Sequence, residues 1–317
     1  MKIFLAGATG ALGKRLVPQL VARGHHVVGA TRTPDKTDAL RRAGAEPVVV
    51  NALDCAAVMK AVTAARPDVV VHQLTALANI RNLKNLDREF VLTNRLRTEG
   101  TEYLLAAAQA AGAQRFVAQS YTGWPNGHTG GRIKTENDPL DPNPPRSAIK
   151  SLEAIHRLET MASKASGLVG IALRYGSFYG PGTSLATDGD VVQMIRSRKF
   201  PLVGSGAGIW SFIHIDDAAA ATRIAIEGGP SGIYNIVDDE PVEVSIWLPE
   251  LAQAIGAPPP RRVPAWLARF AAGEMIVSMM TEVRGSSNAK AKEILGWKPV
   301  YPIWRDGFRR GLDSGII

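Results

Sequence analysis

The fold is decided by residues 3–13, which read IFLAGATGALG. The first four residues are apolar and predict a buried β-strand. Three glycines follow at three-residue spacing, Gly7, Gly10 and Gly13, and leucines then recur every fourth residue from position 12 to position 20. That spacing is typical of a helix with one apolar face. The stretch therefore predicts a strand, a tight glycine turn and a helix in direct succession.

The rest of the first half repeats this alternation. Apolar runs at residues 27–30, 48–50, 69–71 and 116–118 predict further strands, with amphipathic stretches between them. Strands that are apolar on both faces belong in a parallel sheet covered by helices. We therefore predict an α/β fold, a doubly wound parallel sheet of the Rossmann type, followed by a smaller, mostly helical C-terminal part.

The second half is less regular. Residues 123–146 are rich in proline and glycine and predict a long surface loop beside a cleft. We expect a helix at 147–164, a strand at 169–174, a helix near Val191, a strand at 212–214 and a helix from Asp216. Two more helices are expected, at residues 246–255 and 266–280.

The composition limits the partners and the compartment. The formal net charge is +8, but the basic residues are scattered, so we expect an anionic ligand and no nucleic-acid partner. Cys55 is the single cysteine, so we expect no disulfide and no metal site. The sequence shows neither a leader-like segment nor an apolar run of membrane-spanning length. We therefore expect a soluble, cytoplasmic protein without a membrane partner.

The glycine turn indicates a dinucleotide site. The first glycine permits the turn, the second lets the backbone approach a diphosphate, and the third lets strand and helix pack closely. The diphosphate then rests on the helix N-terminus, where free N–H groups favour anions. The second strand ends without a carboxylate before Asp35, and Arg32 is placed to meet a ribose 2′-phosphate. We predict NADP(H) rather than NAD; the alternative is that Arg32 is a solvated surface charge.

Further motifs follow in an order that resembles the extended short-chain dehydrogenases/reductases, the NAD-dependent epimerase/dehydratase group. The matching segments are an acidic turn at 51–54, a fourth-strand segment at 71–76, a helix with Asn94, a segment at 174–182 and C-terminal landmarks at 212–217, 234–236 and 295–299. Each segment alone is short, and it is their order over nearly the whole chain that carries the resemblance.

The resemblance implies a set of cofactor-binding residues. They are Gly7, Thr9, Gly10, Ala11, Leu12, Gly13, Arg32, Leu53, Asp54, Leu74, Thr75, Ala76, Asn94, Lys150, Tyr175, Gly176 and Ser177. It also implies a dinucleotide-binding core of residues 1–175 plus about 211–237. The substrate-binding part is then about 176–210 plus 238–317, interleaved with the core in one folding unit. Because relatives often dimerise, a homodimer is implied as well.

The chain departs from the family pattern at its catalytic tyrosine. Family members carry a Tyr-x-x-x-Lys pair, in which the tyrosine relays a proton and the lysine holds the nicotinamide ribose. Lys150 matches the lysine, but Arg146 stands four residues before it, and no tyrosine lies between residues 122 and 174. Losing a positioned acid or base costs about 10²–10⁴ in rate. Either another group supplies the proton, or the chemistry differs from the family's.

Tyr121 is the best replacement. It follows the fifth predicted strand, at the position of the family's catalytic hydroxyl, with Ser120 and Thr122 beside it. We predict that Tyr121 donates or accepts the proton, assisted by Thr122, Ser120 or Lys150. The alternative is that Tyr121 only packs against the cofactor.

On the substrate side, the candidates are Arg146, Trp124 and Tyr179. A guanidinium at position 146 is suited to a carboxylate or phosphate, although Arg146 is equally read as a solvated loop charge. A stripe of Trp266, Phe270 and methionines at 275–280 is read as core or as the wall of a pocket for a bulky apolar substrate. The sequence leaves both substrate types open.

The prediction is an enzyme, an NADP(H)-binding oxidoreductase or an epimerase/dehydratase with an atypical site, acting on a small molecule. Two alternatives remain. One is a dinucleotide-binding sensor or regulator without catalysis. The other is a lyase or cyclase that uses the same cleft without redox chemistry.

Overall fold

A computed structural model describes residues 1–77 and 83–313. Its centre is a seven-stranded sheet in which every neighbouring pair is parallel. In spatial order the strands are β12 (Gly232–Ile236), β7 (Val169–Tyr175), β5 (Arg115–Tyr121), β4 (Val69–His72), β1 (Lys2–Ala6), β2 (His26–Thr31) and β3 (Glu46–Val49). The order reverses between β1 and β4, and in doubly wound sheets a ligand crevice forms at that point.

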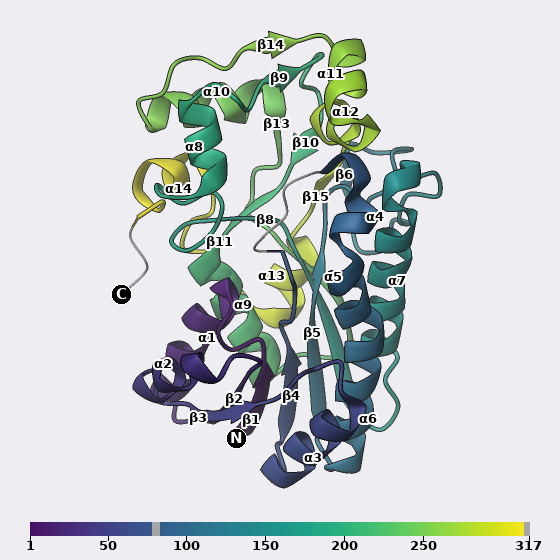
Figure 1. Cartoon of the computed structure of the whole chain (residues 1–317), viewed down its shortest axis with the longest axis vertical. Helices are drawn as coiled ribbons and strands as arrows, with labels where there is room; N and C mark the ends of the chain where they lie inside the picture. Colours follow the sequence, from purple (N-terminus) through teal and green to yellow (C-terminus); the bar gives the residue numbers. More distant parts are fainter. Residues whose placement is uncertain (78–82, 314–317) are drawn as a thin grey trace.

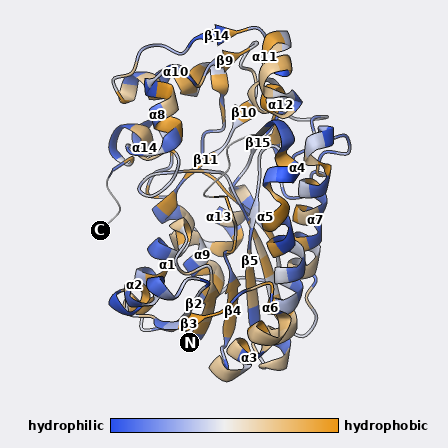
Figure 2. Ribbon diagram, in the orientation of Figure 1, coloured by the Kyte–Doolittle hydropathy of each residue, from blue (hydrophilic) through white to orange (hydrophobic). Residues whose placement is uncertain are grey.

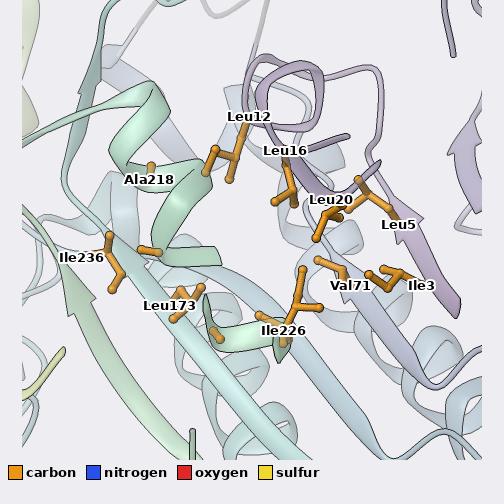
Figure 3. Close-up of a cluster of buried hydrophobic side chains, with 14 of the residues drawn as sticks. Ile3, Leu5, Leu12, Leu16, Leu20, Val71, Leu173, Ala218, Ile226 and Ile236 are labelled. Carbon is orange, nitrogen blue, oxygen red and sulfur yellow. The ribbon is translucent and has the colours of Figure 1, made fainter. Parts of the chain in front are cut away.

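Helices cover both faces of the sheet (Figure 1). On one face lie α1 (Ala11–Ala22), α2 (Thr37–Arg42) and α9 (Ile215–Glu227); on the other lie α3 (Cys55–Ala65), α6 (Thr101–Ala110) and α7 (Ile149–Ser163). Figure 3 shows the first face, where Leu12, Leu16 and Leu20 of α1 pack with Leu173 and Ala218. The leucine spacing that predicted α1 therefore points its apolar side at the sheet. Figure 2 shows the same pattern in hydropathy, with hydrophobic strands inside and hydrophilic outer helix faces.

A second hydrophobic core lies beyond the carboxyl edge of the sheet, at the top of Figure 1. Its largest side chains are aromatic and include Phe212, Trp247, Trp304 and Phe308. The elements that build this part are β8 (Ser177–Tyr179), α8 (Asp190–Arg196), β9 (Leu202–Val203), β10 (Ile209–Trp210), β11 (Phe212–His214), β13 (Val242–Glu243), α10 (Val244–Ala254), β14 (Arg262–Val263), α11 (Ala265–Ala272), α12 (Glu274–Thr281) and α14 (Trp304–Arg310).

The long loop at 123–146 is tied to this second part. Its strand β6 (Ile133–Lys134) pairs with β15 (Gly285–Ser286), and α13 (Ala289–Leu295) then returns to the sheet. A 3₁₀ turn (Arg146–Ala148) precedes α7. On the α7 side, α4 (Leu86–Glu89), α5 (Val91–Arg95) and a π-helical turn η3 (Leu96–Gly100) lead into α6.

One element prediction was wrong. Residues 266–280 form two helices, because Gly273 between α11 and α12 adopts φ +93, which breaks the helical path. Trp266 and Phe270 on α11 are 70% and 82% exposed, whereas Met275 and Met280 on α12 are buried. The expected continuous stripe is thus divided, with Trp266 and Phe270 in solvent, Met275 and Met280 in the core, and Met279 partly buried between them. No helix within the described ranges is both long and apolar enough to span a membrane.

Candidate active site

The glycine turn has the shape that a diphosphate requires. A side chain at Gly7 would place its Cβ 2.5 Å from the Gln73 carbonyl oxygen, and one at Gly13 would lie 2.3 Å from the Gly7 oxygen. At Gly10 a Cβ would meet only the Gly7 oxygen, at 3.3 Å. Gly7 and Gly13 thus allow close packing, whereas Gly10 leaves open space beside the start of α1. No described side chain caps that helix, so its first N–H groups point to this space.

The other residues of the turn have separate roles. Leu12 is buried in the core, so only its backbone faces the turn, whereas Ala11 is exposed at the first helical position. Thr9 is partly exposed between Gly7 and Gly10. The arrangement fits a bound dinucleotide diphosphate held by backbone groups rather than by side chains.

The end of β2 lies where an adenosine ribose is expected. Arg32 is exposed directly after β2, and the Thr31 hydroxyl is held by the backbone of Thr33. The Asp54 carboxylate accepts a hydrogen bond from the backbone N–H of Ala57 at 3.0 Å and so caps α3. Leu53 precedes it, partly buried. Arg32 and Asp54 are both exposed, and of the two Arg32 carries the positive charge that a phosphate requires.

The segment after β4 is fixed by His72. Its Nδ1 accepts from the backbone N–H of Leu74 at 3.2 Å, so its Nε2 carries the proton and donates to the Leu96 carbonyl at 3.1 Å. Burial lowers the pKa of His72 to about 4, which keeps the ring neutral. Thr75 and Ala76 follow, partly buried, and Ala76 donates its N–H to the hydroxyl of Thr93.

A small cavity opens at the end of β5. It is lined by Tyr121, Thr122, Gly123, Trp124, Ser177, Trp210, Ser211, Met279 and Val283. The Tyr121 hydroxyl lies 3.3 Å from the Ser177 hydroxyl, so β5 and β8 meet at this point. The indole of Trp210 donates to the Met279 carbonyl at 2.8 Å, which fixes its ring as a wall. The structure therefore brings the predicted residues Tyr121, Trp124 and Ser177 together.

The surroundings of Tyr121 favour its neutral form. Burial raises the pKa of the Tyr121 phenol, and the hydrogen bond from Ser177 and the charge of Arg97 oppose that rise only in part. A base needs the opposite shift. The arrangement suits a proton donor, which must hold its proton until the substrate develops negative charge.

Ser120 and Thr122 are buried and have other partners. Ser120 donates to Glu159 at 2.6 Å. The Thr122 hydroxyl lies 2.6 Å from that of Ser286 and 3.2 Å from the amide oxygen of Asn126. These contacts join the end of β5 to α7 and to β15. Both hydroxyls next to Tyr121 therefore stabilise the packing of these elements.

Lys150 lies in the first turn of α7 with an exposed side chain. The carboxylate of Asp87 accepts the backbone N–H groups of Lys150 and Ser151 and the Ser151 hydroxyl. The amide of Asn94 donates to that hydroxyl at 3.1 Å. Asn94 is thus joined to the start of α7 at Ser151, next to Lys150.

The remaining predicted residues are spread over the fold. Tyr179 is fully buried and packs edge-on against Phe212 and Phe308, so it contributes to the second core and not to the cavity. The Tyr175 hydroxyl is buried and lies 2.7 Å from that of Thr222. A Cβ at Gly176 would lie 2.5 Å from the Ser211 oxygen, which requires glycine for packing. Arg146 is exposed in the 3₁₀ turn before α7.

Sequence reasoning missed three residues. Trp210 lines the cavity, but it follows an unremarkable stretch and only folding brings it to Tyr121. Met279 also lines the cavity, and it belongs to the methionine stripe that the sequence offered as core or as the wall of a pocket. Arg97 and Glu159 are buried beneath β5, and no motif marked either one. The sequence feature that could have indicated them is that each charged residue lies on a helix face that is otherwise apolar.

These features define a doubly wound dinucleotide-binding enzyme fold with its cleft at the carboxyl edge of the sheet. The model of the NAD dependent epimerase/dehydratase family matches residues 3–237. The chain belongs to this family. With the glycine turn, this makes a nicotinamide dinucleotide its cofactor.

The relatives include proteins that are named reductases. The chain is 45% identical to the 3-diazoavenalumate denitrifying reductase of a Streptomyces species, over 98% of this chain and 100% of the relative. It is 28% identical to 4-hydroxy-2-methyl-3-oxo-4-farnesyl-3,4-dihydroquinoline-1-oxide ketoreductase of Stigmatella aurantiaca, over 81% of this chain and 74% of the relative.

Solved structures confirm the fold. The UDP-glucose 4-epimerase of Thermotoga maritima, with UDP-glucose, has a TM-score of 0.77 at 22% identity and covers 98% of this chain and 97% of its own. A human epimerase family protein, with NADPH, has a TM-score of 0.74 at 19% identity and covers 98% of this chain and 99% of its own.

Proposed function

We propose that the protein is an NADPH-dependent reductase whose substrate binds in the cavity beside Tyr121. The observation that carries the proposal is the 45% identity, over 98% of this chain and 100% of the relative, to a denitrifying reductase. The bound nicotinamide supplies a hydride. The chain's own residues hold the diphosphate at Gly10 and position the substrate between Tyr121 and Trp210.

The preference for NADPH rests on Arg32. The guanidinium is exposed directly after β2, whereas the Asp54 carboxylate accepts the backbone N–H of Ala57 as the cap of α3. One charge-assisted hydrogen bond to a 2′-phosphate contributes about 1.5–3 kcal/mol, roughly ten- to a hundredfold in affinity. An acidic residue at the same place would repel that phosphate.

The proposed substrate class is an aromatic compound with a diazo group in its diazonium form. The cavity walls include Trp124, Trp210 and Met279, whose apolar side chains would flank a flat ring. The cavity volume is about 10 Å³, room for a single water, so these side chains must move apart to admit the ring. In the reaction the hydride forms a C–H bond at the ring carbon that carries the diazonium group, the bond between that carbon and nitrogen breaks with its electron pair passing to nitrogen, and the products are the arene and dinitrogen. The charges balance without a proton, because the hydride neutralises the cation.

This chemistry gives a reason for the sequence departure at the catalytic tyrosine. The usual tyrosine protonates an oxygen that becomes negative as hydride arrives. Reduction of a diazonium forms no such oxygen. This chain has Arg146 where the motif requires tyrosine, so it lacks the usual acid. A diazonium substrate does not use that acid, and hydride transfer can proceed without it.

A second candidate is ketone reduction with Tyr121 as the acid. The favouring observation is the neutral Tyr121 phenol, held at 3.3 Å from Ser177 and lining the cavity. Hydride then adds to the carbonyl carbon, the phenol O–H bond breaks, and its proton passes to the carbonyl oxygen. Solvent reprotonates the phenolate afterwards.

The test compares both substrate classes. Purified protein with NADPH is given arenediazonium carboxylates labelled with ¹⁵N and, separately, aryl ketones; labelled dinitrogen, alcohol product and NADPH loss are measured. We expect the protein to release dinitrogen, and the rate of that release in Tyr121→Phe should stay within about threefold of the unchanged protein. The rate of any ketone reduction should fall by about a hundredfold or more in the same variant. Tight NADPH binding without turnover on either panel would contradict the reductase proposal and favour a sensor.

A further inference from the structure

The short helix α11 carries large apolar side chains that are exposed to solvent. Figure 1 shows α11 and β14 at the end of the molecule where the second core lies. Trp266 is 70% exposed, Phe270 82% and Leu267 42%. Of the eight residues of α11 only Ala268 is buried, where it packs into the second core. We call Trp266, Leu267 and Phe270 the apolar tip.

The apolar tip is smaller than a stable interface between two protein chains. At about 200 Å² for a whole large side chain, its members together expose roughly 400 Å². A stable interface covers about 800 Å² on each partner. An exposed apolar patch of a few hundred Å² is nevertheless large for a protein surface and often marks an interaction site. The apolar tip therefore suits a partner that needs only a shallow apolar contact.

Basic side chains lie at both ends of α11. Arg261 and Arg262 precede the helix and are exposed. At the other end of the helix, the Nζ of Lys84 donates to the Phe270 carbonyl at 3.1 Å. Residues 251–273 contain three arginines and no acidic residue. The third arginine, on the helix itself, forms an ion pair with the glutamate at the start of α12, so it adds no net charge.

A second basic segment lies beside β14. Strand β14 pairs in parallel with β9, and the N–H of Leu202 donates to the Arg261 carbonyl at 2.8 Å. Arg198 and Lys199 are exposed just before β9. In the part of the chain that the structure describes, neither these two side chains nor those of Arg261 and Arg262 form an ion pair. The surface next to the apolar tip is therefore positively charged.

An anionic lipid surface fits both features. Trp, Phe and Leu are the side chains with which peripheral helices enter the boundary between lipid headgroups and acyl chains. Long Arg and Lys side chains reach headgroup phosphates while their stems stay against apolar surface. Each basic residue near an anionic membrane adds about fivefold in affinity. Two copies of this chain that met at the apolar tip would instead bring like charges together.

We propose that α11 and the basic residues beside it bind an anionic lipid surface, with Trp266, Leu267 and Phe270 inserted at the headgroup boundary. The attachment is peripheral and needs no membrane-spanning helix. It differs from the expectation, drawn from the sequence, that the chain has no membrane partner. It goes beyond the proposed reductase function and does not depend on it. Because α12 follows α11 and carries Met279 of the cavity wall, the attached end also includes one wall of the cavity.

Co-sedimentation of the full chain with vesicles tests the proposal. The vesicles contain phosphatidylcholine alone or phosphatidylcholine with phosphatidylglycerol, and the salt concentration is about 0.1 M or about 1 M, where charges are screened over about 10 Å and about 3 Å. We expect binding to the anionic vesicles at the lower salt, and at least about tenfold weaker binding to them at the higher salt or to the neutral vesicles. No binding to anionic vesicles at the lower salt overturns the proposal, as does equal binding to both kinds of vesicle.

Two double variants separate the apolar contribution from the charges. Trp266→Ala with Phe270→Ala retains every charge and should weaken binding to anionic vesicles at least about tenfold. Its thermal unfolding should be unchanged, because both side chains are exposed in the folded chain. Arg261→Gln with Arg262→Gln should weaken binding to anionic vesicles about 25-fold, fivefold for each charge, and leave binding to neutral vesicles unchanged.

The matched control combines Val300→Ala with Arg42→Gln. Val300 is 63% exposed, and Arg42 is an exposed cation on α2, beside the central sheet. The control should bind vesicles as the unchanged protein does, and a loss equal to that in the tip variants would overturn the assignment to α11. Sedimentation velocity without lipid examines the second copy: self-association that Trp266→Ala with Phe270→Ala abolishes would assign the apolar tip to a protein contact and also overturn the proposal.

Discussion

Gly10→Ala should weaken cofactor binding while leaving the fold nearly intact. The backbone of Gly10, at φ −74 and ψ 174, is open to any L-residue, and its new Cβ would meet only the Gly7 oxygen at 3.3 Å. We expect a loss of about 1 kcal/mol in the free energy of unfolding, or ~3 °C in Tm. The methyl group, however, occupies the space where a diphosphate approaches α1.

The expected loss in affinity follows from the contact displaced. Removing one charge-assisted hydrogen bond between a backbone N–H and a phosphate costs about 1.5–3 kcal/mol, which raises the Kd for NADPH about 10–150-fold. Isothermal titration calorimetry measures that Kd, and thermal unfolding without ligand measures stability in parallel.

Two matched variants make the comparison decisive. Gly13→Ala places its Cβ 2.3 Å from the Gly7 oxygen and 2.6 Å from the Ala8 carbonyl carbon, so backbone must move and the loss of stability should exceed ~3 kcal/mol. Gly228→Ala, in open space with an extended backbone, should change neither quantity. An unchanged Kd in Gly10→Ala, or equal thermal losses in the variants at positions 10 and 13, would refute this reasoning.

Three further outcomes are expected. Arg32→Ala should raise the Kd for NADPH about 10–100-fold and that for NADH less than about threefold, and an equal loss for both in calorimetry would contradict NADPH preference. Glu159→Gln leaves Arg174 buried without its charge partner and should cost about 3–5 kcal/mol in urea unfolding, and a cost below ~1 kcal/mol would show the pair is not buried as described. Because the pKa of His72 is lowered to about 4 in the folded chain, stability should fall from pH 6.5 towards pH 4 by up to ~3 kcal/mol; His72→Gln should flatten that dependence, and an unaltered slope would contradict it.

The central sheet could be predicted from the sequence because the patterns that indicate its strands are local. A strand, a turn of three glycines and a helix with leucines at four-residue spacing lie within the first twenty residues, and each is visible without knowing the fold. The observed β1, β2 and β5 extend the expected runs by one or more residues, since hydrogen bonding continues past the apolar positions. Tyr121 and Ser177 were likewise indicated by motifs that follow strands.

What the sequence could not show depends on three-dimensional proximity. Tyr179 is an aromatic residue of the type that lines pockets, but at the end of β8 its side chain is buried in the second core. The sequence pattern predicts Arg97 as a surface charge on a helix, but the side chain is buried in the π turn Leu96–Gly100. The split at Gly273 was readable in principle, because a glycine inside a helical pattern weakens it.

A crystal structure of the protein with NADPH tests the central claim most directly. The diphosphate should lie on the backbone N–H groups at the start of α1, the 2′-phosphate should contact Arg32, and the nicotinamide should face the cavity beside Tyr121. A dinucleotide bound elsewhere, or one with its nicotinamide turned away from Tyr121, would contradict the proposed reductase site.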